Sequence, residues 1–194
     1  AQNLPTQECI DANMESLASY AKTAQKYGMV PIVEPEVLIN GDHSIEDCYN
    51  ATSRSIKSLF DYLSTYNVDI SGTILKPNMV TPGTDHINKA TVEEVAQATI
   101  KCLKENVPAE LPGITFLSGG QTEIESTQHL DMMNKIGSFP WKLSFSYGRA
   151  LQASALSAWL GKKENISAAQ GAFSHRAKMN KLASLGKWSE SLEE

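Results

Sequence analysis

Hydrophobic residues in this chain switch repeatedly between two spacings, one typical of strands and one typical of helices. Four short runs have strand-forming composition, over residues 29–33, 73–75, 114–117 and 142–146, and the segments between them place hydrophobic residues every three to four positions. Because parallel strands need a crossover and a helix supplies it, this order predicts an α/β fold with a parallel sheet. Two architectures satisfy it: an open doubly wound sheet, or an arc of a (β/α)8 barrel, whose complete form typically takes about 250 residues.

Polar residues just before the helical segments predict where the helices begin. A hydroxyl side chain there accepts a backbone N–H of the first turn, and an acidic residue three positions later completes a capping box. The candidates are Thr6, Ser44 with Asp47, Thr91 with Glu94, and Thr122 with Glu125. A further helix starts in the alanine-rich residues 150–153. A final helix over residues 164–185 has one apolar side, made of Ile166, Ala169, Phe173 and Ala177.

The overall composition is that of a globular protein and argues against two functional classes. The 194 residues are 41% hydrophobic and 20% charged. A net charge of -5, with no basic block interleaved with aromatic residues, argues against nucleic-acid binding. No apolar run approaches the roughly 20 residues of a membrane span, so no membrane partner is expected.

Cysteine and histidine positions argue against a metal site and a disulfide framework. Cys9, Cys48 and Cys102 lack CxxC spacing, and the last two fall on apolar faces of predicted helices. Cys48 and Cys102 are therefore expected to be small core residues of a protein in a reducing, cytoplasmic compartment. The four histidines are scattered, so neither a metal nor a cofactor is expected.

Lys76 stands at the end of the second predicted strand, directly before Pro77. Apolar neighbours would desolvate its amine and favour the neutral form, which is the nucleophilic one. The alternative is a strand-end lysine whose long side chain simply reaches water.

Polar residues follow every predicted strand. They are Glu34 and Glu36 after the first, Lys76 after the second, Ser118 with two glycines after the third, and Ser146 with Arg149 after the fourth. Barrel enzymes place their catalytic groups at these carboxyl ends. Because side chains alternate along a strand, Glu34 and Glu36 should point to one face, where a carboxylate could move protons for a Schiff-base lysine.

Two glycine-containing turns predict a phosphate site. Residues 118–120 (Ser-Gly-Gly) offer unobstructed backbone N–H groups, although such a triplet is also an ordinary turn. Gly148 and Arg149 open a helix, whose first amides and guanidinium attract an anion. If the last two strands are the seventh and eighth of a barrel, Ser118, Gly119, Gly148 and Arg149 form one phosphate site.

Four segments resemble those of class I fructose-1,6-bisphosphate aldolases. They are residues 30–36 (VPIVEPE), 72–83 (GTILKPNMVTPG), 113–121 (GITFLSGGQ) and 143–159 (LSFSYGRALQASALSAW). The resemblance implies a (β/α)8 TIM barrel that reversibly cleaves fructose 1,6-bisphosphate into dihydroxyacetone phosphate and glyceraldehyde 3-phosphate in glycolysis and gluconeogenesis. It also implies that residues 1–194 are the C-terminal half of a single barrel domain, strands five to eight, without the N-terminal half and the C-terminal tail.

The resemblance assigns roles to the strand-end residues. Lys76 would form the Schiff base, Glu34 would be the general acid/base and Glu36 its supporting carboxylate. The phosphate of the dihydroxyacetone half would be held by Ser118, Gly119, Ser146, Gly148 and Arg149. The family implies sugar-phosphate substrates, a homotetramer at full length and a cytoplasmic location, with a plastid also open.

Taken alone, half a barrel is expected to be inactive and to expose strand edges and its inner face, which predicts poor solubility or association. Two rival hypotheses stay open. One is a scaffold protein that uses the aldolase fold without turnover. The other is a Schiff-base barrel enzyme that acts on a different phosphorylated ketose.

Overall fold

A single parallel sheet organises the computed structural model, which describes residues 4–194. Its strands lie in the order β1-β2-β3-β4: β1 (Ile32–Val33), β2 (Ile74–Leu75), β3 (Gly113–Phe116) and β4 (Lys142–Phe145). The helices are α1 (Gln7–Lys26), α2 (Ile45–Thr65), α3 (Val92–Asn106), α4 (Glu123–Ile136), α5 (Arg149–Trp159) and α6 (Ile166–Ala183). Short 3-10 turns are η1 (Ile70–Gly72), η2 (Lys163–Asn165) and η3 (Glu190–Leu192).

The two faces of the sheet differ in cover. One register row joins Val33, Leu75, Ile114 and Leu143, and all four are buried on the side of the helices. The neighbouring row begins with Ile32, which is 46% exposed, so the opposite face is open. Sequential strand order without a switch point, together with cover on one face, is the arrangement of a barrel arc rather than of a doubly wound sheet.

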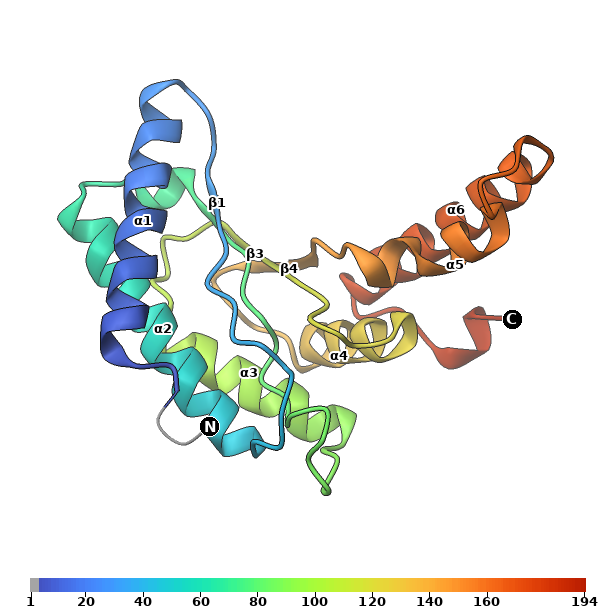
Figure 1. Cartoon of the computed structure of the whole chain (residues 1–194), viewed down its shortest axis with the longest axis horizontal. Helices are drawn as coiled ribbons and strands as arrows, with labels where there is room; N and C mark the ends of the chain where they lie inside the picture. Colours follow the sequence, from blue (N-terminus) through green and yellow to red (C-terminus); the bar gives the residue numbers. More distant parts are fainter. Residues whose placement is uncertain (1–3) are drawn as a thin grey trace.

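Helices α1 to α4 lie along the covered side of the sheet, whereas α5 and α6 pack against each other as a hairpin that projects from the rest of the molecule (Figure 1). Among residues 4–194, no helix has both the length and the apolar character needed to cross a bilayer.

The helix starts agree with the capping residues read from the sequence. The hydroxyls of Thr6, Ser44, Thr91 and Thr122 each accept a first-turn N–H, and the last three complete capping boxes. Strand lengths agree less well, because the run over residues 29–33 pairs only at Ile32–Val33. Met29 and Val30 are 57% and 64% exposed, since β1 is an edge strand with a neighbour on one side only.

The prediction that the apolar side of the last helix is its buried face is wrong. Ile166 and Phe173 are 45% and 41% exposed, and Ala169 and Ala177 are half-buried. The buried residues of α6 are Arg176, Met179, Asn180 and Ala183. The difference arises because α6 packs against α4 as well as α5, and its buried residues all lie in its second half.

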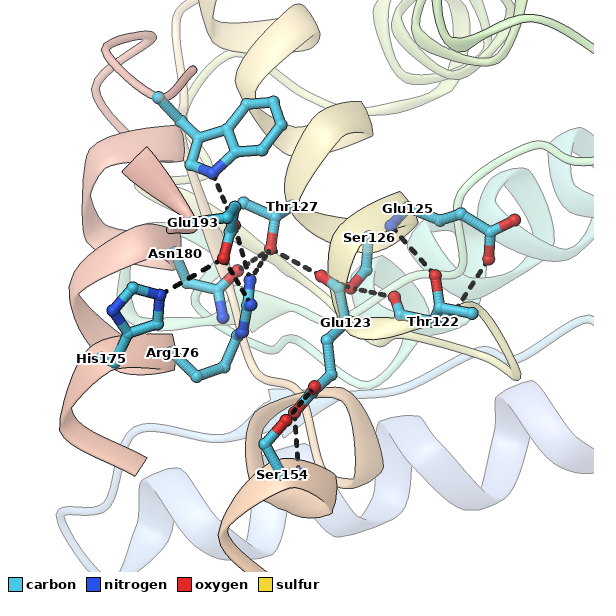
Figure 2. Close-up of polar contacts among 11 residues, drawn as sticks. Thr122, Glu123, Glu125, Ser126, Thr127, Ser154, His175, Arg176, Asn180 and Glu193 are labelled. Carbon is cyan, nitrogen blue, oxygen red and sulfur yellow. Dashed lines mark hydrogen bonds and ion pairs between the residues drawn. The ribbon is translucent and has the colours of Figure 1, made fainter. Parts of the chain in front are cut away.

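A polar network fastens the segment around η3 to α4 and α6 (Figure 2). The guanidinium of Arg176 donates to both carboxylate oxygens of Glu193, at 2.9 and 2.6 Å, and to Thr127 Oγ1 at 3.3 Å. Glu193 also accepts the indole N–H of Trp188 at 2.7 Å. Burial raises the pKa of Glu193, but the hydrogen bonds from Arg176 and Trp188 outweigh it, and the net pKa lies below the ordinary value.

Candidate active site

Lys76 and Glu34 meet at the carboxyl ends of β1 and β2. The backbone N–H of Lys76 donates to Val33 O at 2.8 Å, which continues the parallel ladder one residue past β2. Its side chain therefore shares the open face with Ile74. Lys76 Nζ lies 2.9 Å from Glu34 Oε1, within reach of proton transfer, and the two side chains are 21% and 41% exposed.

Glu36 lies on the same open side as Glu34. Pro35 between them is buried, which is the alternation predicted from the sequence. Glu34 thus contacts Lys76, whereas Glu36, two residues further along the chain, is exposed.

The loops that carry these residues are joined beyond the strands. Gly83 N–H donates to His43 O, and Thr84 N–H donates to Ile39 O, each at 2.9 Å. A Cβ at Gly83 would lie 2.1 Å from Gly41 O, so only glycine permits this approach. The segments after β1 and β2 are therefore held together by backbone contacts.

The turn after β3 has the tight geometry expected of its glycines. Gly119 and Gly120 have φ values of 47° and 80°, a region that favours glycine. Ser118 is 7% exposed, and its carbonyl accepts the N–H of Gln121 at 2.9 Å. The turn leads directly into the N-terminus of α4, which begins at Glu123.

A buried histidine, His129 of α4, contacts the residue that follows this turn. His129 Nδ1 lies 2.6 Å from Gln121 Oε1, and the imidazole is 7% exposed. Burial lowers the pKa of His129 to about 4, so the ring is neutral at pH 7. Its place is structural, and residues 4–194 contain no group of three or more His, Cys, Asp or Glu side chains suited to hold a metal ion.

The end of β4 lies beside this turn. Ser146 N–H donates to Phe116 O at 2.8 Å, and α5 begins at Arg149, which is exposed together with Gly148. Figure 2 shows Glu123 of α4 pointing to Ser154 of α5. Glu123 accepts the N–H of Ser154 at 3.0 Å and also its hydroxyl, so the N-terminus of α4 is bound to the middle of α5.

The predicted site residues thus form two groups on one edge of the sheet. Lys76, Glu34 and Glu36 follow β1 and β2, and the candidate phosphate group of Ser118, Gly119, Ser146, Gly148 and Arg149 follows β3 and β4. The register row continued from Glu34 and Lys76 passes through Thr115 and Ser144. The Thr115 hydroxyl is buried and has no hydrogen-bond partner among the described residues.

Asn78 was not singled out by sequence reasoning, although it lies inside the segment that carries Lys76. It is 5% exposed, and its side chain contacts Val37, Thr52 and Met79. The available signal was a polar residue between apolar ones, Pro77 and Met79, directly after a strand. Its partners lie 41 and 26 residues away, which sequence spacing does not reveal.

Comparison with known proteins decides the family. A family model described as glycolytic, fructose-bisphosphate aldolase class-I, matches residues 1–194. The chain belongs to the class I fructose-bisphosphate aldolase family. It is 52% identical over 187 residues to a probable fructose-bisphosphate aldolase class 1 of Xylella fastidiosa, covering 96% of this chain and 56% of that protein. It is 49% identical over 185 residues to cytosolic fructose-bisphosphate aldolase 4 of Arabidopsis thaliana, covering 95% and 47%.

A solved aldolase confirms the fold class. The structure of the Plasmodium falciparum fructose-bisphosphate aldolase in complex with TRAP and a small-molecule inhibitor superposes with a TM-score of 0.94 at 45% identity. The match covers 95% of this chain and 53% of that one. The sheet and helices are thus those of a partial (β/α) barrel, and the chain spans about half the length of the relatives it matches.

Proposed function

We propose that this chain supplies the Schiff-base half of an aldolase that reversibly cleaves fructose 1,6-bisphosphate into dihydroxyacetone phosphate and glyceraldehyde 3-phosphate. The observation that carries the proposal is the 2.9 Å contact between Lys76 Nζ and Glu34 Oε1 at the strand ends of an aldolase-type arc. Membership of the family and the neighbouring glycine turns support it.

In the proposed reaction, the neutral amine of Lys76 attacks the ketone carbon, and Glu34 donates the proton with which the carbinolamine oxygen leaves as water. The Glu34 carboxylate left by that step takes the proton of the hydroxyl on the fourth carbon. The protonated imine accepts the electron pair released when the bond between the third and fourth carbons breaks, and glyceraldehyde 3-phosphate leaves. This gives an enamine, which is then protonated and hydrolysed. Glu36 is the supporting carboxylate.

Phosphate binding provides the position from which this chemistry starts. We assign the phosphate of the dihydroxyacetone half to Ser118, Gly119, Ser146, Gly148 and Arg149. The N-terminal amides of α5 and the Arg149 guanidinium favour an anion there. An anchored phosphate holds the ketone within reach of Lys76, which replaces a bimolecular encounter by a positioned one.

We further propose that residues 1–194 form the C-terminal half of one barrel domain, strands five to eight, and that the arc alone is inactive. At full length we propose a cytoplasmic homotetramer, on the basis of the family resemblance. The buried free thiols of Cys48 and Cys102 support a reducing compartment. Light scattering of a full-length protein tests the tetramer.

The experiment uses a chimera in which residues 1–194 replace the matching segment of the Xylella fastidiosa relative. The chimera is reduced with borohydride in the presence of dihydroxyacetone phosphate and then mapped by peptide mass spectrometry. We expect one adduct, on Lys76, which the Lys76→Met variant loses.

Lys142→Met is the matched control, because Lys142 is an exposed lysine at the N-terminal end of β4, opposite to the carboxyl ends where Lys76 lies. We expect it to keep the adduct on Lys76. An adduct on another lysine would contradict the assignment. Trapping with other ketose phosphates but not with fructose 1,6-bisphosphate would favour a different Schiff-base enzyme, and absence of any adduct would favour a scaffold role.

A further inference from the structure

Asn78 links the segment that carries Lys76 to the segment that carries Glu34. Its Oδ1 accepts the backbone N–H of Val37 at 3.0 Å. Its Nδ2 donates to Thr52 Oγ1 of α2 at 3.0 Å and to Met79 O at 3.1 Å. The amide is buried, so each of these bonds is made away from water.

The Lys76 segment is itself fixed to the helices on both sides. Asn78 fastens it to α2, and two residues later Val80 N–H donates to Thr99 Oγ1 of α3 at 2.9 Å. The backbone that follows Lys76 is therefore held in place by hydrogen bonds to two helices.

The Glu34 segment has less support of its own. β1 contains two paired residues and lies at the edge of the sheet, and the Glu34 side chain is 41% exposed. The backbone bonds between the two loops begin only at Ile39, five residues beyond Glu34. Apart from the Lys76–Glu34 contact itself, the hydrogen bond from Val37 N–H to Asn78 Oδ1 is the link between the two loops, among the described residues, that lies between the strands and Ile39.

We propose that Asn78 is a positioning residue that keeps the Glu34 carboxylate at proton-transfer distance from Lys76. The inference rests on the proposed function. The 2.9 Å contact spans the ends of two segments, and a displacement of about 1 Å would take it out of hydrogen-bond range. Misplacement of that size reduces catalysis by up to about 10²-fold.

The test compares variants of the same full-length chimera. Asn78→Leu keeps the approximate size of the side chain and removes its hydrogen bonds. We expect kcat for fructose 1,6-bisphosphate cleavage and the rate of adduct formation at Lys76 to fall at least about tenfold. We expect KM to change by less than about twofold, because the proposed phosphate residues belong to the ends of β3 and β4.

Asn106→Leu is the matched control. Its Nδ2 donates to Ser53 Oγ of α2, the neighbour of Thr52, at 2.9 Å and to Cys102 O at 2.8 Å, but it makes no contact with the loop after β1. We expect both leucine variants to lower the melting temperature and only Asn78→Leu to lower kcat. Equal losses of kcat would overturn the positioning role.

Asn78→Asp tests the link to Val37 directly. It keeps an oxygen acceptor for the Val37 N–H, and the Thr52 hydroxyl can turn to donate to it. We expect it to recover part of the lost kcat, and a variant as slow as Asn78→Leu would overturn the role of the acceptor. Thr52→Val removes only the anchor on α2, so it gives a smaller loss and a usable variant if Asn78→Leu does not fold.

Hydrogen exchange of residues 34–40 provides a measurement that does not depend on the reaction. We expect faster exchange in Asn78→Leu and wild-type exchange in Asn106→Leu. If Asn78→Leu still forms the adduct at Lys76, and its hydrogen exchange and kcat are those of the wild type, the positioning role is refuted. The proposed function would not be affected by that result. Faster exchange without any trapping at Lys76 would refute the proposed function while showing that Asn78 holds the segment.

Discussion

At the scale of single residues, the two glutamates after β1 differ in what they touch. Glu34 lies 2.9 Å from the Lys76 amine, and Glu36 is exposed on the same side of the chain. Only the first is placed to exchange a proton with the lysine or with an adduct on it. The resemblance to class I aldolases implies different roles for the two glutamates, and the structure adds that Glu34 contacts Lys76.

We predict that Glu34→Gln in the full-length chimera lowers kcat by about 10²- to 10⁴-fold, the usual contribution of a positioned acid or base. The amide keeps the size of the side chain but cannot transfer the proton. Steady-state cleavage of fructose 1,6-bisphosphate at neutral pH measures it. Glu36→Gln is the comparison, and we expect it to lower kcat by a smaller factor. Equal losses of kcat in the two variants would argue against Glu34 as the principal proton donor.

The sequence predicted which side chains stand at the strand ends better than it predicted their contacts. Lys76, Glu34 and Glu36 follow from strand-end positions and from alternation along the chain, which are local properties. The role inferred for Asn78 depends on Val37, which follows β1, and on Thr52 of α2, and both lie far from Asn78 in the sequence. Periodicity does not encode such contacts.

At the scale of elements, helix starts were predictable and helix faces were less so. The boxes formed by Ser44 with Asp47 and by Thr91 with Glu94 use neighbours three positions apart, so the sequence shows them directly. The buried face of α6 is decided by where α4 lies, and Arg176 and Asn180 occupy it in place of Phe173. The short pairing of β1 likewise depends on its place at the edge.

The contact between α4 and α5 gives a prediction at this scale. Ser154→Ala removes the hydroxyl that donates to Glu123. We expect the free energy of unfolding to fall by about 1 kcal/mol, the typical net worth of a hydrogen bond. Urea unfolding measures it, and Ser157→Ala on the same helix, also exposed, should stay within about 0.5 kcal/mol of wild type. Because alanine is a better helix former than serine, helix propensity cannot cause such a loss, and an equal loss in both variants would contradict a specific contribution of the Glu123 contact.

At the scale of the whole molecule, Glu193 is one of the charged groups that attach the segment around η3, beside Asp131 and Lys135 of α4, which bind the backbone of Trp188. The pKa of Glu193 is lowered in the fold, so its carboxylate contributes stability above the ordinary value of 4.5. That contribution is lost as the pH falls through the lowered pKa. We therefore predict that acidification below pH 4.5 loosens this segment from α4 and α6.

The indole N–H resonance of Trp188 reports this step, because that group donates to Glu193. We expect its chemical shift to move with pH below 4.5 in the wild-type protein and to be independent of pH in Glu193→Gln. Glu190→Gln, in the same turn, should behave as wild type. A Trp188 signal that does not respond to acid would contradict the attachment through Glu193.

One face of the sheet is covered by helices of this chain, and the other face is open. Val33, Leu75, Ile114 and Leu143 complete their packing with helices of this same chain, whereas Ile32, Ile74 and Lys142 point to the opposite side. In gene shuffling among aldolases, the first set should therefore be inherited together. The second set should be taken from the parent that supplies the rest of the barrel, and libraries built in this way should yield more active clones than libraries that mix the two sets.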